Sequence, residues 1–330
     1  MIKKFTLSMA ILMASSALFS CGRTVPAHDN NFADVPVDMG TQLTTSELAT
    51  EPITDDTPVT DDRGAQYIET NVETNVSGQI GAPEHIEIDP YMPEGYELSD
   101  SCVIDGFETV MQNPELPTGC EITALTQTLN FYGFDVDKVD LCDMFMPIDI
   151  NGYYSMNSAY LGDPRSNNGF GCNAPVITMA ASYYFTWIGS DWYSVDLTGI
   201  SLQEVFYQIE CGRPVVVWST IDQRETYAEF QFTLGCGEDF YFNPYQHCLT
   251  IYGYDYSRGV VYVADPLAGN VQYDMDRFER IYDVMGDQAI ILCGNEESAG
   301  VEYSTEKEKA EWLKNIQESI KNELPGVILY

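Results

Sequence analysis

Cys120 has the residue type and the local setting that nucleophilic catalysis requires. It follows Gly119 directly and opens a segment in which Leu125, Leu129 and Tyr132 recur at helical spacing. A helix N-terminus supplies free backbone N–H groups and a partial positive charge, which lower the pKa of a thiol and favour the thiolate. We therefore predict a nucleophile at the first turn of a helix, although a lone cysteine in this setting is more often inert.

A cysteine nucleophile needs a general base, and the sequence offers one candidate in the folded region. His247 is the single histidine there, because His28 and His85 lie in the N-terminal part of the chain. If Cys120 has an imidazole partner, that partner must be His247. An ordinary buried histidine is the alternative interpretation.

Asp265 is the candidate that would orient the imidazole. His247 begins one apolar strand-like segment, and Asp265 ends the next. If Tyr254 pairs with Val260 across a short loop, Asp265 lies opposite Leu249. His247 then lies on the same face as Asp265, about 7–8 Å away at the backbone. A shift of one residue in the pairing would put the two on opposite faces, and an ordinary turn aspartate is the alternative.

An oxyanion site completes this chemistry, and Gln112 is its candidate side chain. The amide of Gln112 and the backbone N–H of Cys120 could each donate a hydrogen bond to a developing oxyanion. Losing one such donor typically costs about 2.7–4 kcal/mol of barrier height. Asn113 could do the same, and an amide that only caps the loop is an equally good interpretation.

The elements that must position these residues follow an α+β order. Helices are expected before the antiparallel sheet that carries His247 and Asp265. Residues 147–171 are expected to form a long loop, in which Arg165 could meet a substrate carboxylate or simply be solvated. The expected helices cover 120–132, 139–145, 174–184 and 201–211, and the expected strands cover 215–218, 247–254 and 260–264.

The N-terminus has the pattern of an export signal. Lys3 and Lys4 precede a mostly apolar stretch over residues 5–19, which is too short to span a bilayer. The stretch ends at Ser20 and Cys21, and this end resembles a bacterial lipobox. We therefore predict a lipoprotein signal peptide over residues 1–21, a lipid on Cys21, and anchoring to the outer face of the cell membrane. An ordinary secretory signal with an incidental cysteine is the alternative.

Three further regions follow the signal. Residues 22–100 are rich in Thr, Asp, Glu, Pro and Asn, so we expect a disordered acidic linker. Residues 101–293 are expected to form the catalytic domain. Residues 294–330 form a tail with one helix, whose apolar stripe includes Ile316 and Ile320. Docking of this stripe on the domain is the simpler interpretation, and binding of a partner is the alternative.

Composition excludes several classes of function. The chain carries 15 Lys and Arg against 51 Asp and Glu, a formal charge of −36, so nucleic acid is not an expected partner. None of the nine cysteines forms a CxxC pair and the three histidines lie far apart, so we expect no metal and no cofactor. Setting aside Cys21 and Cys120 leaves seven cysteines, an odd number that cannot all pair within one chain.

Several motifs together resemble the peptidase C39-like domain, a papain-clan group related to the bacteriocin-processing double-glycine peptidases. The resemblance covers about residues 103–292 and implies a papain-like fold with Cys120, His247 and Asp265 as the catalytic residues in that order. It also implies that Gln112 is the oxyanion residue. The segments that carry it are 114–121, 129–133, 169–171, 174–175, 212–218, 252–255 and 265–267.

The sequence therefore predicts a cell-surface cysteine peptidase that acts on a peptide or protein through a thioester intermediate. Two alternatives remain at this point. The first is a catalytically silent binding module of the same fold, since 22 Tyr and 15 Phe offer aromatic contact surface. The second is another enzyme with a Cys–His pair, either a cell-wall peptide hydrolase or an acyltransferase.

Overall fold

The computed structural model describes residues 89–330, apart from the side chain of Glu296. The expected signal peptide, the lipidation site at Cys21 and the linker up to position 88 lie outside the described residues. Within the described part, no helix combines the length and the apolar character that crossing a bilayer requires.

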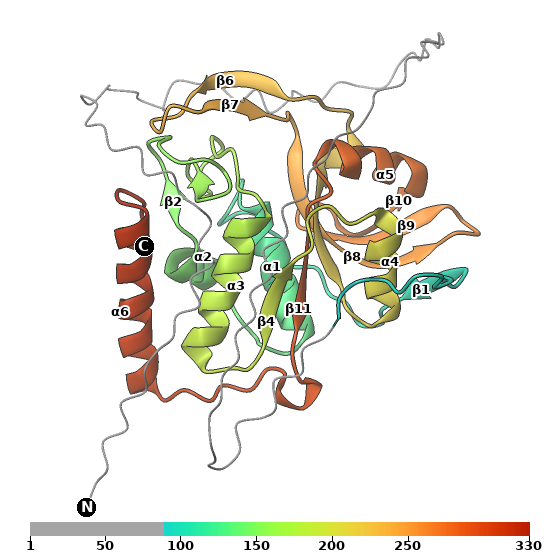
Figure 1. Ribbon diagram of the computed structural model, residues 1–330, viewed down its shortest axis with the longest axis horizontal. Coiled ribbons are helices and arrows are strands. Elements are labelled where there is room, and N and C mark those ends of the chain that lie inside the picture. Colours follow the sequence, from blue (N-terminus) through green and yellow to red (C-terminus); the bar gives the residue numbers. More distant parts are fainter. Residues whose placement is uncertain (1–88) are drawn as a thin grey trace, which may run out of the picture.

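A seven-stranded antiparallel sheet forms the centre of the fold (Figure 1). Its strand order is β10-β9-β8-β5-β11-β4, and β1 pairs with β8. β5 and β11 are buried along their whole length, as expected for strands with continuous apolar sequences. The strands are β1 (Ser101–Val103), β4 (Tyr193–Asp196), β5 (Val215–Thr220), β8 (Gln246–Asp255), β9 (Val260–Asp265), β10 (Gly269–Asp274) and β11 (Ala289–Cys293).

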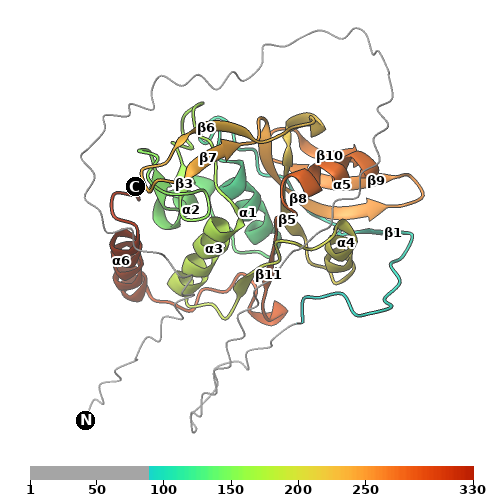
Figure 2. The same cartoon turned by 45° about the horizontal axis from the view of Figure 1, so that its top comes forward.

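Helices cover both faces of the sheet (Figures 1 and 2). α1, α2, α3 and α6 contribute to one hydrophobic core, and α4 and α5 contribute to the other. β5 separates them, because Val216 and Trp218 point into the first core whereas Val215 and Val217 point into the second. The helices are α1 (Cys120–Phe131), α2 (Lys138–Phe145), α3 (Ala174–Ile188), α4 (Leu202–Glu210), α5 (Met275–Val284) and α6 (Glu306–Glu323). The expected α+β fold is confirmed.

Two small sheets lie outside the main one. β2 (Ile148–Asp149) and β3 (Tyr160–Leu161) pair in parallel within the segment that was expected to be only loop. β6 (Glu229–Thr233) and β7 (Asp239–Phe242) form a hairpin at one end of the molecule (Figure 1).

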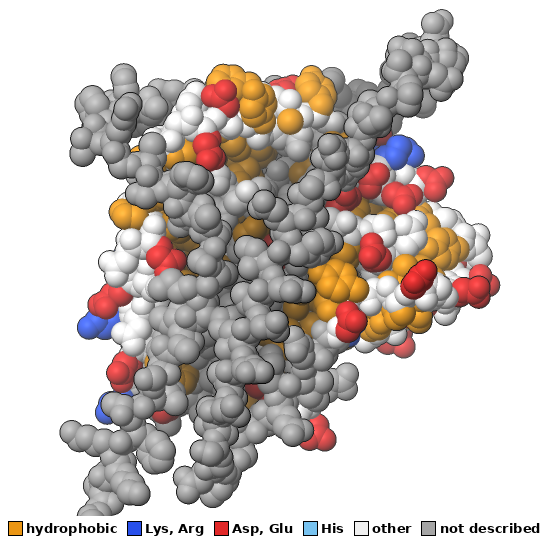
Figure 3. Space-filling view, in the orientation of Figure 1, with side chains coloured by type: hydrophobic (Ala, Val, Ile, Leu, Met, Phe, Trp, Pro, Cys, Tyr) orange, Lys and Arg blue, Asp and Glu red, His pale blue; other side chains and the backbone are white. Residues whose placement is uncertain are grey.

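The hairpin carries aromatic residues on both of its faces. Phe232 and Phe240 pack edge-to-face on Phe170. Phe230 and Tyr241 form an exposed edge-to-face pair on the other face. Hydrophobic side chains are accordingly visible at this end of the molecule in the space-filling view (Figure 3).

The C-terminal tail packs on the domain. Ile316 and Ile320 of α6 belong to the core that α1, α2 and α3 share. Lys309 places its ammonium group 4.8 Å from the ring centre of Trp187. Ile328 forms a β-bridge with Ile148.

Tyr330 and Asp143 hold Arg165. The guanidinium lies 4.1 Å from the ring centre of Tyr330 and forms an ion pair with Asp143. Arg165 is therefore not simply solvated, because its charge is paired with an acidic side chain of this chain. A contact between Arg165 and a substrate carboxylate stays a prediction.

The chain is ordered against the domain before position 101, where the sequence placed the boundary. Glu210 of α4 accepts hydrogen bonds from the hydroxyl of Tyr96 at 2.9 Å and from the backbone N–H of Ser99 at 2.7 Å. The Tyr96 ring also packs edge-to-face on Tyr207. These contacts fasten the end of the expected linker to α4.

Candidate active site

Cys120 is the first residue of α1, so its predicted position at a helix start is confirmed. Gly119 precedes it as the N-cap, and a Cβ atom there would lie 2.8 Å from the Cβ of Leu116. Only glycine therefore allows this turn to pack. The Cys120 side chain is 6% exposed and belongs to the core beside α1.

The turn between β8 and β9 differs from the predicted pairing by one residue. Asp255 pairs with Val260, whereas the sequence analysis paired Tyr254 with Val260. The predicted loop was therefore too long, because β8 continues one residue further than its apolar pattern suggested. If the pairing of Asp255 with Val260 continued unchanged to the far ends of β8 and β9, His247 and Asp265 would lie on opposite faces of the sheet.

A β-bulge at Tyr252 restores the register that the site requires. Such a bulge adds one residue to a single strand and shifts the pairing beyond it by one. Past the bulge, Thr250 pairs with Ala264, which matches the predicted pairing at this end of the strands. His247 and Asp265 therefore share a face, as predicted, for a reason that the sequence analysis had not identified.

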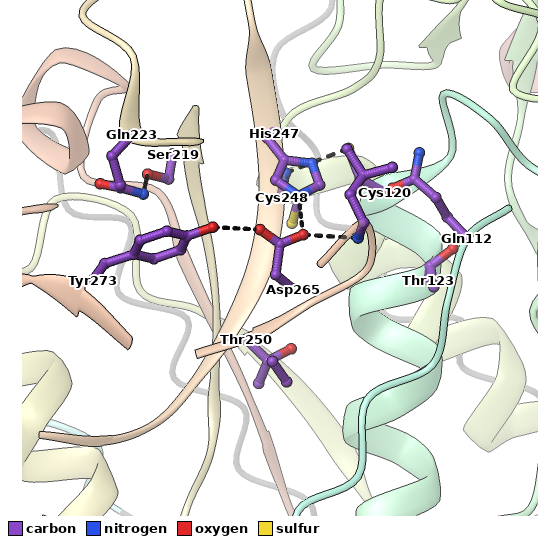
Figure 4. Close-up of polar contacts among 12 residues, drawn as sticks. Gln112, Cys120, Thr123, Ser219, Gln223, His247, Cys248, Thr250, Asp265 and Tyr273 are labelled. Atoms are coloured by element: carbon purple, nitrogen blue, oxygen red, sulfur yellow. Dashed lines mark hydrogen bonds and ion pairs between the residues drawn. The ribbon is translucent and has the colours of Figure 1, made fainter. Parts of the chain in front are cut away.

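The imidazole of His247 is held by a fully engaged carboxylate (Figure 4). Nε2 of His247 lies 2.6 Å from Oδ1 of Asp265, and both side chains are buried. Oδ1 also accepts a hydrogen bond from the Leu267 backbone N–H at 2.8 Å, and Oδ2 accepts one from the Tyr273 hydroxyl at 2.8 Å. Since Nε2 is engaged, Nδ1 is the ring nitrogen that remains for proton transfer.

These contacts determine the ionisation of Asp265. Burial raises the pKa of its carboxyl group, but hydrogen bonding to His247 and the charge of that imidazole lower it more. The Leu267 N–H and the Tyr273 hydroxyl act in the same direction, which leaves the pKa at about 2. Asp265 is therefore a stable carboxylate at neutral pH. Tyr273 was not singled out from the sequence, because no local pattern links it to position 265.

Cys120 and His247 line one cleft of about 530 Å³, a volume that includes the solvent at its mouth. The cleft walls come from the segment before α1, the loop before α3, the end of β7 and the start of β8. Phe170 and Phe242 add an aromatic wall next to the hairpin. The structure thus brings the predicted nucleophile and base to a single opening.

The sulfur of Cys120 makes two contacts, and neither involves the imidazole. Sγ accepts a hydrogen bond from the Cys248 backbone N–H at 3.3 Å and donates one to Oε2 of Glu121, also at 3.3 Å. Within the described residues, no hydrogen bond joins Sγ to the His247 ring.

The pKa of the Cys120 thiol lies well above its ordinary value, first because the group is buried and next because of the charge on Glu121. This direction is opposite to the lowering that the sequence analysis expected. Desolvation and the adjacent carboxylate outweigh the hydrogen bond from the Cys248 N–H, which lowers the pKa.

Glu121 is the residue that the sequence analysis missed. It is 1% exposed and lines the cleft, and its Oε1 accepts a hydrogen bond from the Cys172 backbone N–H at 3.0 Å. Burial raises the pKa of its carboxyl group, although nearby N–H groups lower it in part. The sequence offered one signal that could have identified it, because Glu121 is the single charged residue in the sequence of α1.

Gln112 lines the cleft beside Cys120 and is 2% exposed (Figure 4). Its Nε2 donates one hydrogen bond to the Pro117 carbonyl at 2.6 Å, which leaves the second N–H of that amide for another acceptor. Oε1 is buried and has no hydrogen-bond partner among residues 89–330. Asn113, the other candidate, is exposed and does not line the cleft.

This fold, with helices before an antiparallel sheet, matches the class of C39-like peptidase structures. The chain belongs to the Peptidase_C39 like family, whose model matches residues 104–290. The chain is also similar to a crystal structure of a putative C39-like peptidase from Bacillus anthracis. That similarity has a TM-score of 0.51 and 26% identity, and it covers 59% of this chain and 98% of that one.

A relative in Bacillus subtilis (strain 168) is the uncharacterized protein YvpB. It is 31% identical to this chain over 193 residues, which are 55% of this chain and 72% of YvpB. Its printed name assigns no activity. The comparisons therefore establish the family and the fold, while the activity has to be argued from the site.

Proposed function

We propose that the protein is a cysteine peptidase that hydrolyses peptide or amide bonds. The observation that carries this proposal is that His247, held 2.6 Å from Asp265, lines the same cleft as Cys120. A buried, pre-oriented imidazole with one unused nitrogen is what a thiol nucleophile requires from its base. Membership of a peptidase family supports the same reaction class.

The reaction begins when Nδ1 of His247 takes the proton of the Cys120 thiol. The thiolate attacks the substrate carbonyl, and the backbone N–H of Cys120 and the second N–H of Gln112 hold the oxyanion. The first N–H of a helix has no partner within the helix, so that of Cys120 is suited to this task. His247 then protonates the leaving amine, and the resulting thioester is hydrolysed by a water that His247 activates.

An extended peptide with neutral or apolar side chains fits the cleft best. Apart from the catalytic imidazole, its lining contains no basic side chain, and Glu121 is its single acidic one. Aromatic and aliphatic residues, including Phe170, Phe242 and Leu267, supply most of the remaining surface. A substrate with acidic groups near the scissile bond would meet no positive partner.

We place this activity at the outer face of a bacterial cell membrane, with Cys21 lipidated. The basic start, the short apolar stretch and the lipobox-like end support this placement. Growth with a radiolabelled fatty acid tests it, because the chain should carry label and the Cys21→Ala variant should not. A wild-type chain that carries no lipid would refute the anchor.

Hydrolysis of a peptide library by the purified chain tests the function. Cys120→Ala should lower the rate at least about a thousandfold, because the nucleophile is lost. Cys211→Ser is the matched control, since Cys211 is exposed and distant in sequence from the cleft residues, and it should retain the wild-type rate. Full activity in folded Cys120→Ala would show that another residue performs the hydrolysis.

One observation favours a catalytically silent binding module as the second candidate. The Cys120 sulfur bonds to Glu121 and not to His247 in this structure. Such a module would bind peptides equally well with and without the sulfur, and wild-type protein would hydrolyse none of them. Binding of library peptides to wild type and to Cys120→Ala, measured beside hydrolysis, separates the two candidates.

A further inference from the structure

The carboxyl group of Glu121 touches the atom that would react. Its Oε2 lies 3.3 Å from Sγ of Cys120, and its Oε1 is occupied by the Cys172 N–H. The two oxygens therefore face different partners. Both residues line the cleft, so this contact belongs to the catalytic centre itself.

The surrounding backbone holds the carboxyl group in this position. Gly171 has a φ of +117°, a conformation that favours glycine, and a Cβ there would collide with Oε1 of Glu121. The next residue, Cys172, supplies the N–H that holds Oε1. The loop before α3 thus packs closely around the Glu121 carboxyl group. The carboxyl group therefore has little freedom to turn away from the sulfur.

We propose that Cys120 and Glu121 share a single proton, so that the carboxylate keeps the sulfur as a thiol and restrains the nucleophile until Glu121 is protonated. Two negative charges at 3.3 Å in a buried site cannot both persist, because each disfavours ionisation of the other. The proton in the S–H···O contact therefore belongs to Cys120 and Glu121 together and not to either residue alone. The role of Cys120 in peptide hydrolysis rests on the proposed function, whereas the shared proton rests on the contact between Cys120 and Glu121.

The other groups around the pair do not cancel this repulsion. Among the groups that act on Glu121, His247 is the cation-forming side chain, and its ring lies 2.6 Å from the Asp265 carboxylate. Arg165, which contacts Cys142, is paired with Asp143. The remaining neighbours are thiols and a phenol that burial keeps neutral. The titratable groups around the pair are Cys142 of α2, Tyr160 of β3, Cys172 before α3, His247 and Cys248 of β8, and Asp265 of β9.

The shared proton sets the pH range in which the sulfur is reactive. Burial raises the pKa of Glu121, so its protonation begins at a higher pH than for an exposed glutamate. As the pH falls, Glu121 becomes neutral, which removes the charge that opposes the thiolate. As the pH rises, the carboxylate returns and the sulfur keeps its proton. Over the range in which Glu121 titrates, the reactivity of the sulfur should therefore fall less steeply with decreasing pH than that of an ordinary thiol.

The test is the pH dependence of Cys120 alkylation by iodoacetamide in the full chain, with Glu121→Gln compared with wild type. The amide keeps the shape and the acceptor for the Cys172 N–H but removes the charge. Mass spectrometry should locate the label at Cys120, because other cysteines are present. We expect the midpoint of the rate profile to fall by at least about one pH unit, which is about tenfold faster labelling below both midpoints.

Glu115→Gln is the matched control. It removes the same charge from the segment that precedes Cys120, but the Glu115 side chain is half exposed and pairs with Lys138 at 2.8 Å. Its midpoint should equal that of wild type. If Glu121→Gln does not fold, Glu121→Asp replaces it. Its shorter carboxylate withdraws from the sulfur and should lower the midpoint by a smaller amount.

Three outcomes would overturn the proposal. They are an unchanged midpoint in folded Glu121→Gln, a raised midpoint, and loss of labelling at every pH, which would make Glu121 a required base. Peptide hydrolysis is measured on the same samples. A lowered midpoint without any hydrolysis would sink the peptidase function alone, whereas hydrolysis with an unchanged midpoint would sink the shared proton alone.

Discussion

The two walls of the cleft are prepared for the reaction to different degrees. On the sheet wall, Asp265 is bound by His247, Leu267 and Tyr273, and its pKa lies at about 2. On the helix wall, the Cys120 thiol is buried against a carboxylate and its pKa is well above the ordinary value. The sheet wall stabilises the negative charge of Asp265, whereas the helix wall disfavours the thiolate that Cys120 must form.

This difference separates orientation from activation. The base needs no rearrangement, because β8 and β9 hold the imidazole and its partner as a rigid pair. The nucleophile needs a change, because its proton lies towards Glu121 and not towards His247. The sheet thus supplies geometry, while the first turn of α1 governs when the sulfur becomes reactive.

The largest effect on the sheet wall is expected from Asp265→Asn. An amide cannot stabilise the imidazolium and favours the wrong tautomer, so kcat for peptide hydrolysis should fall by about 10⁴. The comparison variant is Asp255→Asn, at the other end of β8, where the side chain binds Ser257 in the turn. It should hydrolyse peptides like wild type. Near-normal activity in Asp265→Asn would remove Asp265 from the site.

Gln112→Ala should have an effect of intermediate size on kcat, and it tests the oxyanion site rather than either wall. Loss of one oxyanion donor lowers kcat by about 10²–10³ and leaves KM nearly unchanged. Alkylation of Cys120 should not change, since that reaction develops no oxyanion. Asn113→Ala is the paired variant, because Asn113 is adjacent and exposed. If Asn113→Ala shows the larger loss of kcat, the assignment moves to Asn113.

The smallest effect is expected from Tyr273→Phe, which removes one hydrogen bond from Asp265. The folded-state pKa of Asp265, about 2, lies below its ordinary value of 3.8, so its ionisation stabilises the fold above about pH 4. This contribution is lost as the pH falls towards 2. The variant should raise that pKa and lower the free energy of unfolding at pH 7 by about 1 kcal/mol.

Urea unfolding at pH 7 and pH 3 measures the effect of Tyr273→Phe. The difference in unfolding free energy between wild type and variant should shrink at the lower pH, because the Tyr273 hydroxyl stabilises the carboxylate and Asp265 of the variant is then partly protonated in the folded chain. Tyr262→Phe is the control, since its hydroxyl binds Arg258 on the surface. An equal difference at both pH values would assign Tyr273 a packing role only.

The sequence alone determined the features that depend on local pattern. The helix spacing after Gly119 placed Cys120 at a helix start, and the apolar strand segments placed His247 and Asp265 on neighbouring strands. The continuous apolar segment over residues 215–218 predicted a strand, and β5 is buried along its whole length. These predictions succeeded because periodicity and turn chemistry act over a few neighbouring residues.

Tertiary structure alone decided the register and the charge states of the site. The bulge at Tyr252 and the hydrogen bond from Tyr273 depend on strand pairing that no local pattern specifies. Glu121 is adjacent to Cys120 in the sequence, but its carboxyl group is held by the Cys172 N–H from the loop before α3. The pKa of the Cys120 thiol illustrates the reason. A helix N-terminus is visible in the sequence, but the depth of burial comes from every element that packs around the sulfur. Desolvation and the charge of Glu121 raise the pKa of this thiol more than the hydrogen bond from the Cys248 N–H lowers it.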